Sequence, residues 1–364
     1  MHWIIHFLIP FIAFFFIACS SSSGDNNNSS PIADDYIAPQ ALTYHDDANI
    51  TALTTGYGRF GKYRVETKSI ANTQYNDKPE YQALHLQTTL YYPVDAPTPR
   101  PTLFFYSGYH IYHDDAYKAL LYFVASKGYN IIFMTCPDVE LRNLIPLTQD
   151  ALDAFRADID TTKVGFLGHS MGAGVSFWLI KAFESTLGSQ ARLLFPMASG
   201  YTVFNTNLIP SGKTISLPNN TKMIMQMYQN DGTTDPRIGV DLFLNNTIKI
   251  QDKNFMFIYG DATHIADHGT VITKATYDYD ALMQRTIFRP LDALMDAAFN
   301  HNDQAIEHLK NEISADAYFN PYIGTTPQID IEQYILPETQ YPYNCSKGGS
   351  VTSKRKEYCK ALGL

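Results

Sequence analysis

The chain reads Gly168-His169-Ser170-Met171-Gly172 at a point where two periodic patterns meet. The motif follows the apolar run Thr162-Lys-Val-Gly-Phe-Leu167, which predicts a buried strand, and precedes Ala173-Gly-Val-Ser-Phe-Trp-Leu-Ile180, which predicts a helix. A strand, then G-x-S-x-G, then a helix is the context in which a serine is held on a sharp, strained turn. A side chain at Gly168 or Gly172 would collide with the neighbouring strand or helix. The alternative is an ordinary glycine-rich turn; the context favours Ser170 as a nucleophile.

Further strands and helices alternate on both sides of this motif. Alternation of this kind predicts an α/β protein with a mostly parallel sheet that helices cover on both faces. We expect antiparallel strands over Thr55–Val65 and Leu84–Tyr92. The other expected elements are strands at Thr102–Tyr106, Asn130–Thr135, Leu193–Ala198, Lys222–Tyr228 and Asn254–Tyr259, with helices at Asp115–Lys127 and Leu147–Ala157.

A serine hydroxyl is a weak nucleophile, so it needs an imidazole to take its proton and a carboxylate to orient that imidazole. In an elbow of this kind the acid and then the histidine follow the serine along the chain, each after a later strand. Asp231 is the first acid after the strand that ends at Tyr228, and Gly232 allows a turn there. Asp235 precedes a proline, which is more typical of a cap or turn. Simple turn chemistry is the alternative for either aspartate.

The loop after the strand that ends at Tyr259 holds two histidines, His264 and His268. We predict His264 as the base because it lies directly after the strand. His268 lies one turn further and remains the alternative, with a role in packing or substrate contact. Asp261 is a poor candidate for the acid because it stands too close to His264 in the sequence.

Two backbone N–H groups are candidates for binding a developing oxyanion. One belongs to Met171, directly after the serine, and the other to Tyr109 in the loop Ser107-Gly108-Tyr109-His110. The Tyr109 ring is also a candidate wall of an acyl pocket. Nearby His113, Asp114 and Asp115 are typical of a helix start rather than of a metal site. We expect neither a metal nor a cofactor.

The N-terminus has the order of an exported, anchored chain. The apolar run Ile4–Ala18 is too short for a comfortable membrane span, and Phe16-Ile-Ala-Cys19 resembles a bacterial lipobox. Residues 20–50 begin with a polar, small-residue stretch that is typical of a flexible tether. We therefore predict a signal peptide over residues 1–19, a lipid anchor on Cys19, and a location in the periplasm or at the outer membrane. A plain signal peptide and a buried N-terminal helix are the alternatives, since residues 1–18 contain no Lys or Arg.

Composition and the remaining cysteines limit the other possibilities. The 364 residues are 45% hydrophobic and 17% charged with a net charge of −9, which indicates a globular protein and, without a basic stripe, argues against nucleic acid as a partner. Cys136 ends an apolar strand and is expected to be a buried thiol. In an oxidising compartment Cys345 and Cys359 could form a disulfide, which would stabilise the folded chain by about 3 kcal/mol. Residues 290–364, with short helices at Pro290–His301 and Asp303–Ile313, are predicted to be an appendage on the domain formed by residues 51–289.

With Gly-His-Ser-Met-Gly and the upstream Ser-Gly-Tyr, the chain resembles α/β-hydrolases of the esterase and lipase kind. It is similar to their cutinase, polyester-hydrolase and dienelactone-hydrolase branches over about residues 55–289. The resemblance implies a central sheet and an acyl-serine intermediate formed without a cofactor. The segment from Ser199 to Lys222 is too short for a helical cap, so we expect an open groove unless the C-terminal tail covers it.

The expected function is hydrolysis of carboxylic esters, with a small molecule, a lipid or a polymer as substrate. A peptidase or amidase of the same fold, and a tethered binding protein without catalysis, are the alternatives.

Overall fold

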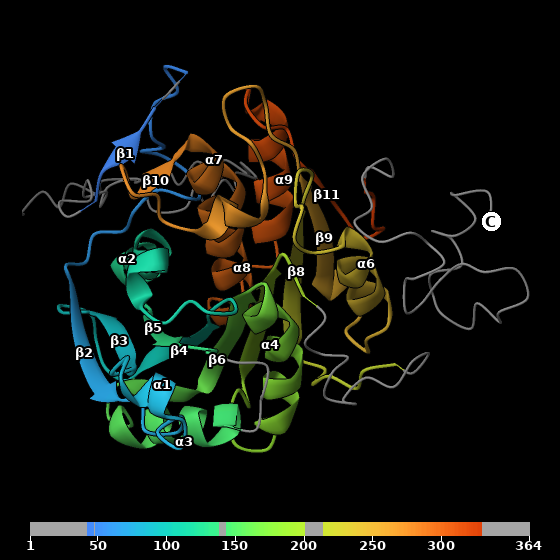
Figure 1. Ribbon diagram of the computed structural model, residues 1–364. Coiled ribbons are helices and arrows are strands. Elements are labelled where there is room, and N and C mark those ends of the chain that lie inside the picture. Colours follow the sequence, from blue (N-terminus) through green and yellow to red (C-terminus); the bar gives the residue numbers. More distant parts are fainter. Residues whose placement is uncertain (1–41, 47, 138–142, 201–213, 330–364) are drawn as a thin grey trace, which may run out of the picture. The chain divides into compact units, whose positions relative to one another are not determined.

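The computed structural model describes residues 42–46, 48–137, 143–200 and 214–329. Its centre is a nine-stranded sheet, counted over these residues, with the strand order β11-β9-β8-β7-β6-β4-β5-β3-β2 (Figure 1). The strands are β1 (Tyr44–His45), β2 (Val65–Ala71), β3 (Gln87–Pro93), β4 (Arg100–Tyr106), β5 (Asn130–Met134), β6 (Ile159–His169), β7 (Ala191–Met197), β8 (Thr221–Tyr228), β9 (Lys253–Ile258), β10 (Tyr279–Asp280) and β11 (Tyr322–Gly324). β1 and β10 pair with each other outside this sheet.

The α-helices are α1 (Pro79–Gln82), α2 (Lys118–Ser126), α3 (Leu144–Ala154), α4 (Met171–Ala182), α6 (Pro236–Leu244), α7 (Ala281–Met283), α8 (Arg289–Phe299) and α9 (Ala305–Ala315). Single 3₁₀ turns form at Asp114–Tyr117, Ile250–Asp252 and His268–Val271, and a π-helical turn at Gln284–Phe288 joins α7 to α8. None of the helices in the described ranges is long and apolar enough to cross a membrane.

Six neighbouring strands of the sheet, from β5 to β9, run parallel, while β2, β3 and β11 pair in the antiparallel direction. Alternate residues of β4 enter two separate cores: Leu103 and Phe105 pack on one face, Phe104 and Tyr106 on the other. Strands that are buried on both faces need apolar residues at nearly every position, which explains their continuous hydrophobic runs.

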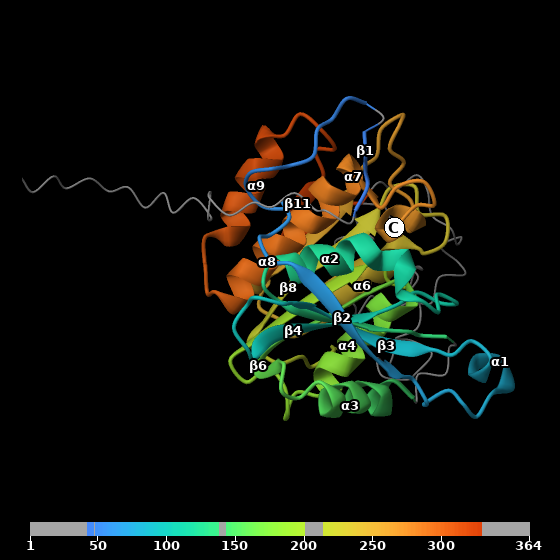
Figure 2. The ribbon, with the colours of Figure 1, turned by 90° about the vertical axis from the view of Figure 1, so that its left-hand side faces the viewer.

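Helices cover both faces of the sheet. Residues of α2, α7, α8 and α9 contribute to one core and residues of α3, α4 and α6 to the other. Figure 2 shows α2 and α8 on one side of the strands and α3 and α4 on the other. The prediction of a mostly parallel α/β sheet with helices on both faces is therefore confirmed.

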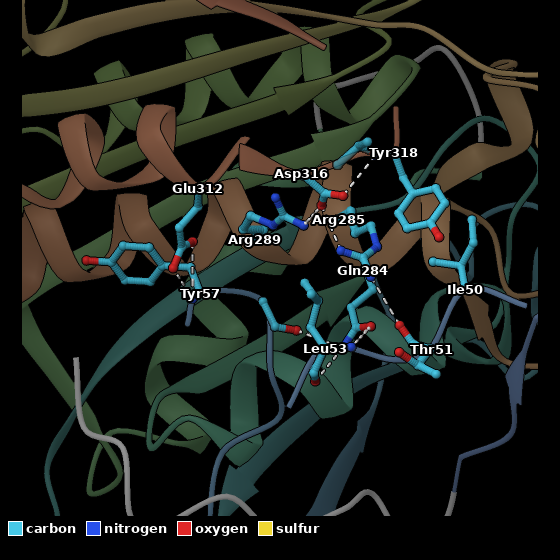
Figure 3. A network of polar contacts seen from close by, with 12 residues as sticks. Ile50, Thr51, Leu53, Tyr57, Gln284, Arg285, Arg289, Glu312, Asp316 and Tyr318 are labelled. Carbon is cyan, nitrogen blue, oxygen red and sulfur yellow. Dashed lines mark hydrogen bonds and ion pairs between the residues drawn. The ribbon is translucent and has the colours of Figure 1, made fainter. Parts of the chain in front are cut away.

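The expected strand over Thr55–Val65 is wrong, since the first strand of the large sheet is β2, from Val65 to Ala71. Gly56 and Gly58 have φ values of +68° and +86°, which turn the chain and prevent an extended run. Side chains from the C-terminal half hold this irregular segment in place (Figure 3). Gln284 accepts a hydrogen bond from the Leu53 N–H at 2.7 Å and donates to the Gly58 carbonyl at 3.2 Å.

Within the described residues, the elements after residue 289 pack into the same core and sheet as the elements before it. Leu291 and Leu294 of α8 are buried in the same core as Leu193 and Phe195 of β7, and β11 extends the sheet beside β9. The segment that the sequence suggested as an appendage thus supplies, as far as residue 324, a core helix and an edge strand.

Of the predicted cysteines, Cys136 is buried as a reduced thiol. Cys19, Cys345 and Cys359 lie outside the described residues, as do the tether up to residue 41 and the part of the expected open groove at residues 201–213.

Candidate active site

Ser170 stands alone between the end of β6 and the start of α4, with φ +56° and ψ −116°. A positive φ in a residue with a side chain is costly and persists only where the surroundings impose it. Its N–H donates to the Met197 carbonyl at 2.9 Å, and its carbonyl accepts from the Gly200 N–H at 3.0 Å, so the end of β7 holds the turn. The sequence prediction of a strained serine between strand and helix is confirmed.

The two glycines of the motif are required for close packing. A Cβ on Gly172 would lie 2.0 Å from the Tyr106 carbonyl oxygen, and one on Gly168 would lie 2.4 Å from the Gly172 carbonyl carbon. Contacts this short with backbone atoms cannot be relieved by a side-chain movement. The glycines therefore let the first turn of α4 lie directly against the end of β4.

The structure brings Asp231 and His268 together. His268 Nδ1 lies 2.8 Å from Asp231 Oδ2, and the carboxylate also accepts hydrogen bonds from the N–H groups of Thr233 and Thr234, each at 2.8 Å. Burial by itself would raise the pKa of Asp231, but the hydrogen bonds from His268 and Thr234 outweigh it and hold that pKa below its usual value. Asp231 is thus a buried carboxylate that keeps its charge and orients the ring of His268.

The expectation that Asp231 orients His264 is wrong. The His264 ring is buried against Phe319, with Nδ1 near Thr263 Oγ1 at 2.9 Å and Asp261 Oδ1 at 3.2 Å. Asp261 also accepts from the backbone N–H groups of Thr263 and His264, which makes a local turn of residues 261–264. This turn directs His264 inward and carries the chain on, so that His268 is the histidine that reaches Asp231.

His268 and the serine turn are joined through His169, the residue directly before Ser170. The His169 Nε2 atom lies 2.8 Å from the His268 carbonyl oxygen, and the two rings have centroids 4.6 Å apart. The His268 side chain is 19% exposed. Because Nδ1 faces a carboxylate, Nδ1 carries the proton and Nε2 keeps its lone pair. The site therefore places a partly exposed imidazole beside the residue that precedes the serine.

The candidate oxyanion donors lie at the ends of β4 and β6. The Gly108 N–H donates a hydrogen bond to Tyr117 Oη at 2.9 Å. The N–H of Tyr109 donates to none of the described residues. Met171 is buried and begins α4, where the helix dipole favours negative charge. Tyr109 is 49% exposed, and its ring stacks on that of His110 with the centroids 3.7 Å apart; its role as a wall of an acyl pocket stays a prediction.

Other acidic residues have structural roles that the sequence suggested. Asp235 caps α6 by accepting from the Arg237 N–H at 2.9 Å and pairs with the buried Arg237 guanidinium. Asp114 and Asp115 begin a 3₁₀ turn, and Asp114 accepts from the Tyr91 hydroxyl at 2.8 Å. Within the described ranges, no three His, Cys, Asp or Glu side chains have metal-ligand geometry.

Sequence reasoning missed His169 and Tyr117 as members of this site, and it ranked His268 second. The available signal for His268 was the pattern Asp261-x-Thr263-His264, in which an aspartate commonly bonds the backbone two and three residues later. No signal marked Tyr117, which lies 52 residues before His169.

Comparison of the chain with known protein families and with curated proteins gave no match.

Proposed function

We propose that this protein is a serine hydrolase of the α/β-hydrolase fold that cleaves carboxylic esters through an acyl-enzyme intermediate. One observation carries the proposal: His268, paired with the buried Asp231, lies against the strained turn that presents Ser170. Asp231, His268 and Ser170 all lie at the carboxyl ends of parallel strands, or just beyond them, where α/β proteins place their sites.

The chemistry follows from the tautomer of His268. Its Nε2 takes the proton of the Ser170 hydroxyl as that oxygen attacks the ester carbonyl. The buried Asp231 carboxylate stabilises the imidazolium that forms, and its lowered pKa keeps it charged during this step. The N–H groups of Tyr109 and Met171 stabilise the oxyanion. His268 then protonates the leaving alkoxide. In the second half of the reaction His268 takes a proton from water as the water oxygen attacks the acyl carbon, and it gives that proton to Ser170 Oγ as the acid leaves.

A fluorophosphonate probe tests this proposal. We expect the purified protein to be labelled on Ser170 and to hydrolyse short chromogenic esters, and Ser170→Ala to abolish both. A folded sample that is neither labelled nor active would refute the proposal, and hydrolysis of aminoacyl amides in preference to esters would move it to the amidase alternative.

The two neighbouring histidines provide a matched control. His268→Gln is expected to lower kcat by at least about 100-fold, while His264→Gln retains most of it, because the His264 ring bonds Thr263 and Asp261 and does not orient towards Asp231. Equal losses in the two variants would contradict the assignment of His268 as the base.

We extend the proposal to location: the chain is exported and held at a membrane through lipidated Cys19, in the periplasm or at the outer membrane. The order of apolar run, cysteine and polar tether in residues 4–30 supports it. An ester in a small molecule, a lipid or a polymer is the substrate class.

A further inference from the structure

A line of hydrogen bonds joins three loops of the candidate active site. The Gly108 N–H donates to Tyr117 Oη at 2.9 Å, Tyr117 Oη lies 3.0 Å from His169 Nδ1, and His169 Nε2 lies 2.8 Å from the His268 carbonyl oxygen. Gly108 belongs to the loop of the candidate oxyanion donor, His169 precedes the serine, and His268 is the proposed base. No side chain of the proposed triad takes part in this line.

The direction of every hydrogen bond in the line is determined. A carbonyl oxygen only accepts, so His169 Nε2 donates to His268. Burial, with a further contribution from nearby His268, lowers the pKa of His169 to about 3, so its ring is neutral and Nδ1 is an acceptor. The Tyr117 hydroxyl therefore donates to Nδ1, and its oxygen is left to accept from Gly108.

The line is built from buried groups. His169 is 1% exposed and Tyr117 is fully buried. A buried polar group that loses its partner is costly, so neither ring can turn away without leaving another group unpaired. A Cβ on Gly108 would lie 3.3 Å from both His169 Nδ1 and Tyr117 Oη, which shows how closely the loop backbone packs on the two rings.

We propose that His169 and Tyr117 are positioning residues, which fix the backbone of His268 relative to Ser170 and to the oxyanion loop. The role rests on the proposed function, because it matters only if His268 is the base. Asp231 orients the His268 ring through its hydrogen bond to Nδ1. His169 fixes the position of the His268 backbone through its hydrogen bond to the His268 carbonyl oxygen. Two attachment points on one histidine leave Nε2 in a single place.

Three substitutions separate the parts of the line. His169→Leu removes both hydrogen bonds of the ring, His169→Gln keeps a donor near the position of Nε2, and Tyr117→Phe removes only the hydroxyl. Since a displacement of about 1 Å can cost about 100-fold in rate, we expect His169→Leu to lower kcat by about that factor with KM little changed. His169→Gln and Tyr117→Phe should each lose about tenfold, so that Gln partly rescues Leu.

Tyr106→Phe is the matched control. Tyr106 is also a buried tyrosine, and its hydroxyl bonds Thr148 Oγ1 at 2.9 Å on the far face of β4. We expect Tyr106→Phe and Tyr117→Phe to lose similar thermal stability, with only Tyr117→Phe losing kcat and its rate of fluorophosphonate labelling. If both variants keep the same kcat within about twofold, or lose it equally, the positioning role is overturned.

Nuclear magnetic resonance of ¹⁵N-labelled histidine tests the line without any assay of activity. The His169 signal, identified by its loss in His169→Gln, is expected to show the Nε2–H tautomer and to remain neutral from pH 8 to pH 5. Protonation in that range, or the Nδ1–H tautomer, would overturn the proposal even in an active enzyme. If the wild-type protein is instead inactive while the tautomer is as expected, the failure lies in the proposed function and not in the geometry.

Discussion

At the scale of single residues, the site depends on two side chains whose ionisation is fixed, one by burial and the other by hydrogen bonds. His169 is neutral because its ring is enclosed and bonded on both nitrogens, and Asp231 is charged because four hydrogen bonds reach its carboxylate. The two residues are therefore opposite cases: burial excludes a proton from one, and hydrogen bonding excludes it from the other.

The neutral state of His169 predicts a pH dependence of stability. The pKa is about 3 in the folded chain and about 6.5 in the unfolded chain, so below pH 6.5 the unfolded state takes up a proton that the folded state does not. The free energy of unfolding therefore has its full value above pH 6.5 and declines as the pH falls towards 3. Between pH 7 and pH 5 the wild type should lose about 2 kcal/mol more free energy of unfolding than His169→Gln. Urea titrations at both values measure this, and parallel pH curves for the two proteins would contradict it.

At the scale of elements, the π-helical turn Gln284–Phe288 anchors a segment that has no secondary structure of its own (Figure 3). Gln284 bonds the backbone of Leu53 and Gly58, and Arg285 donates to the Thr51 carbonyl at 3.1 Å. The Arg285 and Arg289 guanidinium groups share the carboxylate of Asp316, beyond the end of α9. Hydrogen bonds from side chains thus hold the backbone of this segment, where in a strand the backbone of a neighbouring strand would do so.

Gln284→Ala tests this anchoring. It removes the hydrogen bonds to the partly buried N–H and carbonyl of Leu53 and to the buried carbonyl of Gly58, so we expect a loss of about 2 kcal/mol in the free energy of unfolding. Limited proteolysis should cut between residues 50 and 58 faster than in the wild type. Gln304→Ala, at an exposed position before α9, is the control and should change stability by less than about 0.5 kcal/mol. Protection of the segment equal to that of the wild type would show that Gln284 is not its anchor.

At the scale of the whole molecule, one face of the sheet depends on residues far from it in the sequence. Leu291, Leu294, Met295 and Phe299 of α8 are buried in the core that also contains β7, and Leu309 and Ile313 of α9 extend it. Without α8 the apolar residues of that face would be exposed to water.

We therefore expect a chain that ends at Phe288 to lose its cooperative unfolding transition, and the milder Leu294→Ala to cost about 2 to 5 kcal/mol. Circular dichroism during urea titration measures both. A truncated chain with a single sharp transition and an unchanged spectrum would show that residues 290–364 are only an appendage on the domain, as the sequence suggested.

Most of the fold could be predicted from the sequence because each parallel strand is buried on both faces and reads as an apolar run. β4, β5, β7, β8 and β9 all lie within one or two residues of the expected positions. β2 could not be predicted in this way, since five of its seven residues are exposed and its sequence Val-Glu-Thr-Lys-Ser-Ile-Ala has no continuous apolar run.

The sequence alone determined the serine turn, because its glycines are dictated by local contacts between a strand and the helix that follows it. It also placed an aspartate and two histidines after the correct strands. Only the tertiary structure decided between the histidines. Pairing with Asp231 depends on the path of the loop after β9, on a local turn that takes up His264, and on the contact between His169, at the end of β6, and the His268 backbone. These contacts join groups that are far apart along the chain and close in space, so the spacing of residues in the sequence does not reveal them.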